Sequence, residues 1–81
     1  MNPKIRNELI DYIKNNILKY PYHDFNEKTM LLDKGLIDSF GIIELIGFIE
    51  KKYNLILKEK DIINKNFSSI EAIESLINHV Q

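Results

Sequence analysis

The chain of 81 residues contains no cysteine, and it has only three glycines, two prolines and two histidines. The absence of cysteine excludes a disulfide framework, a thiolate zinc site and a cysteine nucleophile. It is also typical of a cytoplasmic protein. The shortage of glycine and proline disfavours a turn-rich β-sandwich. The length allows one small domain, residues 1–81, and not two.

Long apolar runs and a strong excess of one charge are also missing. No segment approaches the roughly 20 apolar residues of a transmembrane helix. The N-terminal stretch 1–16 is interspersed with charge and does not resemble a signal peptide. The net charge of −1 argues against nucleic acid as the main partner. We therefore expect a soluble, cytoplasmic protein with no membrane span.

What the chain does contain is 44% hydrophobic residues, mostly isoleucine and leucine, which is enough for a packed globule. A first helix is predicted from Pro3 to about Lys19, because Asn2 is a good N-cap and Pro21 would end it. Its inward face repeats every four residues: Ile5, Leu9, Ile13 and Ile17. A long loop should follow and lie against the helices through its apolar residues: Phe25, Met30, Leu31 and Leu32.

A second helix is predicted to begin at Asp38 or Ser39 and to end at Asn54, which tolerates a left-handed conformation. Its core face follows steps of three and four: Ile42, Leu45, Ile46, Ile49 and Tyr53.

The last third of the chain predicts a short helix over residues 59–65, with Ile62 and Ile63 inward, and then a final helix. Ser68 and Glu71 form a candidate capping box for that helix. Its inward residues are Ile70, Ile73, Ile77 and Val80. Residues 55–57 could form a strand but have no partner nearby. The fold class is therefore all-α: a small bundle with three longer helices, one short helix and a long first loop.

Familiar catalytic patterns are absent from the sequence. His23 and His79 are far apart and lack metal-ligand spacing, so we expect a solvated loop residue and a terminal one. A serine-hydrolase elbow needs glycine two residues either side of the serine, and around Ser39 only Gly41 fits because position 37 is Ile. The acidic residues nearby are expected to form a solvated face: Asp33, Asp38, Glu44 and Glu50. We predict no catalytic residue, no metal site and no enzyme activity.

Ser39 remains, at a predicted helix start with no base of its own. In one interpretation Ser39, or Asp38, only caps the helix. In the other the serine is a substrate, to which a second enzyme attaches a phosphate group that the helix dipole and free N–H groups stabilise. The spacing alone does not separate the two.

The segment LLDKGLIDSFGIIELIGFIEKKYNL, residues 31–55, resembles the phosphopantetheine attachment region of acyl and peptidyl carrier proteins. That region has a glycine, an Asp-Ser pair followed by Leu or Met, and an amphipathic helix ending in an aromatic residue. The matching residues are Gly35, Asp38, Ser39, Phe40, Glu44, Leu45 and Tyr53. The predicted order of helices also resembles the acyl-carrier fold over nearly the whole chain.

The resemblance implies that a phosphopantetheinyl transferase installs 4′-phosphopantetheine from coenzyme A on Ser39, with Asp38 as a flanking recognition residue. The arm's thiol would hold an acyl or aminoacyl group as a thioester. Partners would be a loading ligase or transferase and downstream biosynthetic enzymes, meeting a monomeric carrier. The implied partner face consists of Phe40, Ile43, Glu44 and Gly47, although Phe40 and Ile43 could instead pack in the core.

The segment also departs from the family pattern. Phe40 replaces the usual Leu or Met, Gly41 stands where fatty-acid carriers often have Asp, and Lys51 and Lys52 replace acidic residues. The second helix therefore has no net charge. This favours a specialised carrier in a polyketide, nonribosomal peptide, aminoacyl or surface-lipid pathway. The alternatives are a housekeeping carrier of fatty-acid biosynthesis and a helical interaction module without the prosthetic group.

Overall fold

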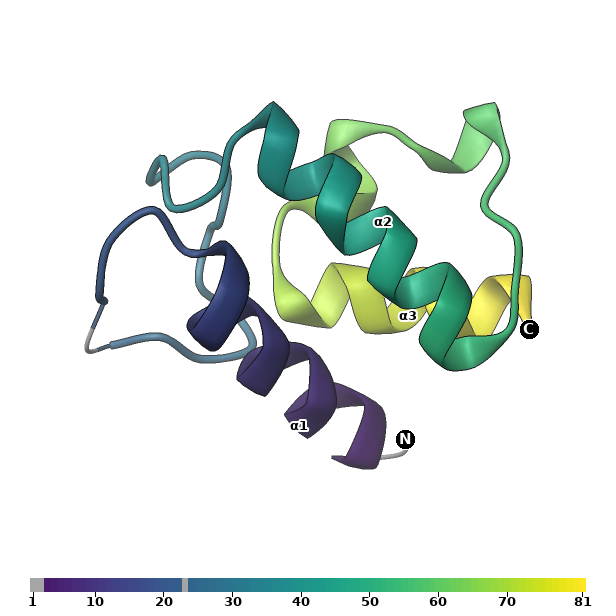
Figure 1. Cartoon of the computed structure of the whole chain (residues 1–81), viewed down its shortest axis with the longest axis horizontal. Helices are drawn as coiled ribbons and strands as arrows, with labels where there is room; N and C mark the ends of the chain where they lie inside the picture. Colours follow the sequence, from purple (N-terminus) through teal and green to yellow (C-terminus); the bar gives the residue numbers. More distant parts are fainter. Residues whose placement is uncertain (1–2, 23) are drawn as a thin grey trace.

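The computed structural model describes residues 3–22 and 24–81, and within these residues it contains helices and no strand (Figure 1). The α-helices are α1 (Pro3–Tyr12), α2 (Ser39–Tyr53) and α3 (Ile70–Val80). Shorter elements are the π-helical turn η1 (Ile13–Ile17) and the 3₁₀ turns η2 (Glu59–Asp61) and η3 (Asn64–Phe67). The all-α prediction is confirmed. Asn2 and His23, for which a cap and a solvated loop position were predicted, lie outside the described residues.

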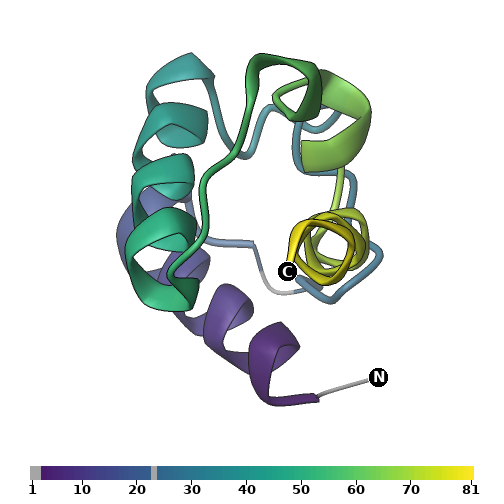
Figure 2. The same ribbon diagram turned by 90° about the vertical axis from the view of Figure 1, so that its right-hand side faces the viewer.

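A single core lies between the three α-helices. Figure 2 shows α3 almost end-on, with α2 across the core from it and α1 below. The predicted inward residues of the first helix are all buried, and so are Leu45 and Ile49 of α2. Of the predicted core residues in α3, Ile70, Ile73 and Ile77 are buried, while Val80 is partly buried. Ile42, Ile46 and Tyr53, also predicted on the core face of α2, are partly buried. Helical spacing therefore identified the inward face of each long helix but not full burial of every residue on it.

The first helix changes geometry earlier than predicted. Regular α-helix ends at Tyr12, the π turn follows, and Leu18 leaves the helix with φ −56° and ψ 131°. Because an α-helix has 3.6 residues per turn, apolar residues spaced every four positions gradually rotate around the helix axis and away from one face. The wider π turn reduces that drift, so Ile13 and Ile17 both stay in the core.

The segment between α2 and α3 differs most from the sequence-based expectation. Two 3₁₀ turns replace the predicted short helix, and Ile62 and Ile63 are 40% and 47% exposed instead of inward. The reason is local: Ile62 has φ −93° and ψ 73°, a non-helical conformation that separates the two turns.

The start of α3 is one residue later than the predicted capping box implies. The Ser69 hydroxyl accepts a hydrogen bond from the Ala72 N–H at 3.1 Å, whereas the Ser68 hydroxyl donates to the Lys65 carbonyl. Of two adjacent serines, the one in extended conformation becomes the cap. The prediction that Ser68 caps the helix was therefore wrong.

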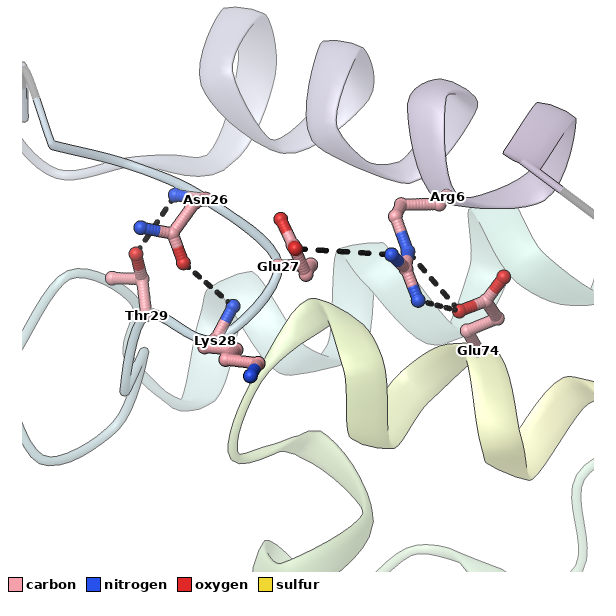
Figure 3. A network of polar contacts seen from close by, with 6 residues as sticks. All are labelled: Arg6, Asn26, Glu27, Lys28, Thr29 and Glu74. Atoms are coloured by element: carbon pink, nitrogen blue, oxygen red, sulfur yellow. Dashed lines mark hydrogen bonds and ion pairs between the residues drawn. The ribbon is translucent and has the colours of Figure 1, made fainter. Parts of the chain in front are cut away.

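The long loop is tied to the helices by apolar and polar contacts. Leu31 is buried and Phe25 and Leu32 are partly buried, as predicted, whereas Met30 is exposed. Figure 3 shows the polar link: the buried Glu74 carboxylate accepts hydrogen bonds from Arg6 at 2.9 and 3.3 Å. Arg6 also lies 3.8 Å from Glu27 of the loop. This pairing compensates a charge that would be costly to bury alone.

A second polar link joins α1 to the end of α2. The Tyr53 hydroxyl donates to Glu8 Oε1 at 3.0 Å, and Lys52 Nζ lies 3.4 Å from Glu8 Oε2. Partial burial by itself raises the pKa of Glu8, but the hydrogen bonds from Tyr53 and Lys52 outweigh it and hold that pKa below its usual 4.5. The ionised form of Glu8 therefore stabilises the folded chain.

Because the pKa of Glu8 is lower in the folded state, its stabilising effect is present at neutral pH and is lost as the pH falls below 4.5. We expect Glu8→Gln to lower the melting temperature at pH 7 and to have a smaller effect at pH 3. Thermal melts followed by circular dichroism across this range test it, with the exposed Asp11→Asn as the control on the same helix. A penalty that stays constant with pH would contradict the assignment.

Candidate functional site

The first turn of α2 presents Ser39 on the surface. Asp38 has extended backbone, with φ −121° and ψ −170°, and its Oδ1 accepts a hydrogen bond from the Gly41 N–H at 3.0 Å. Asp38 is thus the N-cap, and Ser39 is the first helical residue, with an exposed side chain. Within the described residues, no side-chain hydrogen bond engages the Ser39 hydroxyl. The capping role therefore belongs to Asp38 and leaves this hydroxyl available.

Tight packing fixes the position of this turn. A Cβ atom at Gly41 would lie only 2.9 Å from Ile17 Cγ2 and 3.4 Å from Ile37 Cβ, so the helix start approaches η1 more closely than another residue would allow. The Lys19 N–H donates to the Leu36 carbonyl at 2.9 Å, which holds the chain before α2 against the end of the first helix. The glycine that departs from the fatty-acid pattern therefore has a steric reason.

A cation lies beside the cap. Lys19 Nζ is 3.8 Å from Asp38 Oδ2, and both side chains are about half exposed. Both carboxylate oxygens of Asp38 therefore have partners, one in the helix cap and one in the ion pair. The remaining N–H groups of the first turn have no partner within the helix. The surroundings of Ser39 combine a free hydroxyl, a nearby cation and the positive end of a helix dipole.

The predicted partner residues of α2 lie on its exposed face. Phe40 is 83% exposed and Ile43 is 66% exposed, so neither packs in the core. Apart from the neighbouring backbone of its own helix, nothing lies within 4 Å of a Cβ at Gly47, so this position one turn beyond Ile43 faces open space. Glu44 is exposed and accepts a hydrogen bond from the Tyr12 hydroxyl at 3.2 Å. The placement excludes core packing for Phe40 and Ile43, and partner binding stays a prediction.

A feature that sequence reasoning missed lies beside this face. The rings of Tyr12 and Phe48 are stacked, with centroids 3.8 Å apart, and they border a surface groove of about 540 Å³ together with Gly47, Lys51 and Lys52. Burial raises the pKa of the Tyr12 hydroxyl, and the neighbouring Glu44 adds to this effect. Both aromatic residues were visible in the sequence, but no local pattern pairs residues so far apart.

Other candidate residues are not brought together. Glu50 accepts a hydrogen bond from the Leu57 N–H and so supports the chain after α2. His79 is exposed near the end of α3. The described residues hold no group of three or more metal-ligating side chains. Among the helices in the described part of the chain, none has the length and apolarity to cross a membrane.

The chain is similar to a curated protein and to a chain in a solved structure. The chain is 37% identical to Aminoacyl carrier protein 2 of Bradyrhizobium diazoefficiens over 54 residues, which are 67% of this chain. The match spans 60% of the length of that curated relative. The fold is similar to that of a chain in a solved structure described as "Crystal structure of FAD-dependent dehydrogenase". The TM-score is 0.78 and the sequence identity is 28%, and the match covers 86% of this chain and 99% of the other. No protein-family profile matches the sequence.

Proposed function

We propose that this chain is a non-catalytic carrier protein that holds an acyl or aminoacyl group as a thioester on 4′-phosphopantetheine attached to Ser39. The observation that carries the proposal is the exposed Ser39 hydroxyl at the first position of α2, left free because Asp38 performs the capping. The likeness to an aminoacyl carrier protein supports it.

The residues around Ser39 fit the attachment of such a group. Ser39 supplies the attacking oxygen, which bonds to phosphorus while adenosine bisphosphate leaves coenzyme A. The hydroxyl proton passes to a base on the transferase, since the Asp38 carboxylate contacts the Gly41 N–H and Lys19 and not the Ser39 hydroxyl. The helix dipole and the first-turn N–H groups stabilise the resulting phosphodiester. The prosthetic group supplies a terminal thiol, which this cysteine-free chain lacks.

The exposed face of α2 serves as the partner surface in this proposal. Phe40 and Ile43 offer apolar side chains next to the attachment point, and Gly47 leaves room for a side chain of the partner. Glu44 is the charged neighbour within this face. Partners would be a phosphopantetheinyl transferase, a loading enzyme and downstream biosynthetic enzymes acting on a monomeric, cytoplasmic carrier.

An aminoacyl or other specialised cargo is favoured over the fatty-acid role. The curated relative is named as an aminoacyl carrier, and α2 has no net charge because Lys51 and Lys52 balance Glu44 and Glu50. The alternatives are a carrier of fatty-acid biosynthesis and an interaction module without the group.

The likeness to a chain of the FAD-dependent dehydrogenase structure supports a flavin enzyme as one class of partner. Folds that bind dinucleotides are typically built on a parallel β-sheet, whereas the described residues of this chain contain no strand. This chain would therefore carry the substrate of such an enzyme and not bind the flavin itself.

Intact-mass measurement tests the proposed function directly. The chain is coexpressed with a broad-specificity phosphopantetheinyl transferase, and the expected product is heavier by one phosphopantetheine group. Peptide mapping should locate the added mass on the peptide that contains Ser39. A chain that remains unmodified under conditions that convert a known carrier would favour the interaction module.

A charge reversal on α2 tests which pathway the carrier serves. Lys51 is exposed, so it would face and repel the basic surfaces that attract acidic carriers. We expect the unaltered holo protein to accept malonyl groups poorly from a fatty-acid malonyltransferase, and Lys51→Glu to raise kcat/KM several-fold at low salt. Lys52 is left unchanged because it pairs with Glu8.

The matched control for this prediction is Lys28→Glu, which makes the same charge change in the loop. Loading by the cognate enzyme should depend only weakly on salt, since little long-range attraction is available to screen. Efficient malonyl loading of the unaltered protein, unchanged by Lys51→Glu, would restore the fatty-acid interpretation.

A further inference from the structure

A groove of about 410 Å³ lies next to the segment that packs on the first turn of α2. Its walls come from the end of the first helix and the start of the loop, and they include Leu18, Lys19, Tyr20 and Tyr22. Lys19 connects the groove to the site through its ion pair with Asp38 and its backbone hydrogen bond to Leu36. The groove therefore begins at a residue that contacts the neighbour of Ser39.

The groove combines cations with aromatic rings. Lys14 and Lys19 both line it, and Lys34 Nζ lies 5.6 Å from the centre of the Tyr22 ring. The Tyr20 hydroxyl donates to the Lys34 carbonyl at 2.7 Å, which fixes that ring against the turn before α2. Such a groove suits a ligand with an anionic group at one end and a chain of apolar and amide groups after it. The cation would pair with the anionic group, and the aromatic and aliphatic walls would contact the chain.

We propose that this groove binds the phosphopantetheine arm, with Lys19 paired to its phosphodiester and Tyr20 and Tyr22 against its pantetheine portion. The inference rests on the proposed attachment at Ser39. Adding a phosphodiester next to the Asp38 carboxylate places two negative charges side by side, which is unfavourable unless a cation lies between them. Lys19 is already at the carboxylate and is half exposed, so it can serve both anions.

The groove lies on one side of the start of α2, and a different surface lies on the other. Figure 1 shows the end of the first helix to one side of the first turn of α2 and the η2–η3 segment to the opposite side. The latter surface carries the exposed Ile62 and Ile63, and its lysines lie in the same short segment as the acidic Asp61. The arm carries a negative charge at its phosphodiester, next to the attachment point, and this charge is better compensated on the side of Lys19.

A spin label distinguishes the two sides. Because the chain has no cysteine, the arm provides the only thiol, and a nitroxide maleimide will label its tip alone. In ¹⁵N-labelled holo protein whose modification has been confirmed by mass, the amide signals of residues 18–20, 22 and 34 should broaden, and they should recover when the nitroxide is reduced. The mass measurement judges the attachment at Ser39 separately, so its failure is distinct from failure of the groove.

Variants test the role of Lys19. In Lys19→Ala the broadening at residues 18–20 and 22 should fall to the level of distant amides, and the ³¹P resonance of the phosphodiester should shift. The exposed Lys65→Ala, on the opposite side, should change neither. Broadening centred on residues 62–66, uniformly weak broadening, or an unchanged pattern in Lys19→Ala would each overturn the proposal. The side chain of Lys19 forms only a surface ion pair, and its backbone hydrogen bond to Leu36 does not depend on the side chain, so the variant should fold.

Discussion

Ser39→Ala is expected to abolish the gain of phosphopantetheine mass completely and to leave the helical fold in place. The hydroxyl is the attacking group, and its loss removes the only atom at this position that can bond to phosphorus. Stability should change by no more than about 0.5 kcal/mol, because this is an exposed position and Asp38, not Ser39, caps the helix. The measurements are intact mass after coexpression with the transferase and a thermal melt.

Ser75→Ala provides a matched control, since Ser75 is also exposed and also lies in an α-helix. It should be modified as fully as the unaltered chain. A Ser39→Ala chain that still gained the mass would place the modification on another residue and would remove Ser39 from the site. A chain that lost both the mass and its helical signal would show that Ser39 has a structural role that the geometry does not predict.

The start and end of α2 could be predicted because the signals for both are local. An acidic residue before an apolar run predicts a cap, and Asn54 indeed adopts the left-handed conformation that ends the helix, with φ 52°. The core of the long helices was likewise readable from spacing, because burial on one face imposes the helical period. Phe40 and Ile43 fell outside that period, and they are exposed.

Short elements and polar pairs could not be predicted, because single backbone conformations set the former and tertiary contacts select the latter. Adjacent isoleucines at 62 and 63 indicated burial, yet a non-helical residue between two short turns leaves both at the surface. The Arg6–Glu74 pair joins residues on α1 and α3, and the Lys19–Asp38 pair joins the end of the first helix to the start of α2 across the loop. A single sequence contains charges that could pair in many ways, and only the packing of the helices selects among them.

The choice between Ser39 and Asp38 as the cap shows the same limit on a smaller scale. Both residue types are favoured caps, and one position of difference decides whether the serine hydroxyl is occupied or free. Sequence reasoning located the helix start to within one residue but left open which side chain caps it. The extended backbone of Asp38 and its hydrogen bond to Gly41 decide between the two.

The two faces of α2 should respond differently to the loss of a large side chain. Leu45 is fully buried, so Leu45→Ala should destabilise the fold by about 2–5 kcal/mol through lost burial and a residual cavity. Ile43 is mostly exposed, and alanine is the better helix former, so Ile43→Ala should change stability by only about 0.5 kcal/mol. Denaturant unfolding at neutral pH gives both values.

Function should show the opposite order. If Ile43 contributes to the partner face, Ile43→Ala should lower kcat/KM for modification by the transferase by about tenfold, equivalent to about 1.4 kcal/mol of lost contact. Leu45→Ala, measured at a temperature where it remains folded, should retain most of the rate because its side chain does not reach the surface. Ile56→Ala is the matched control, since Ile56 is 76% exposed but lies outside α2. If Ile43→Ala and Ile56→Ala are modified at equal rates, Ile43 is not part of the surface that the transferase recognises. If Ile43→Ala and Leu45→Ala lose equal stability, the faces of α2 are wrongly assigned.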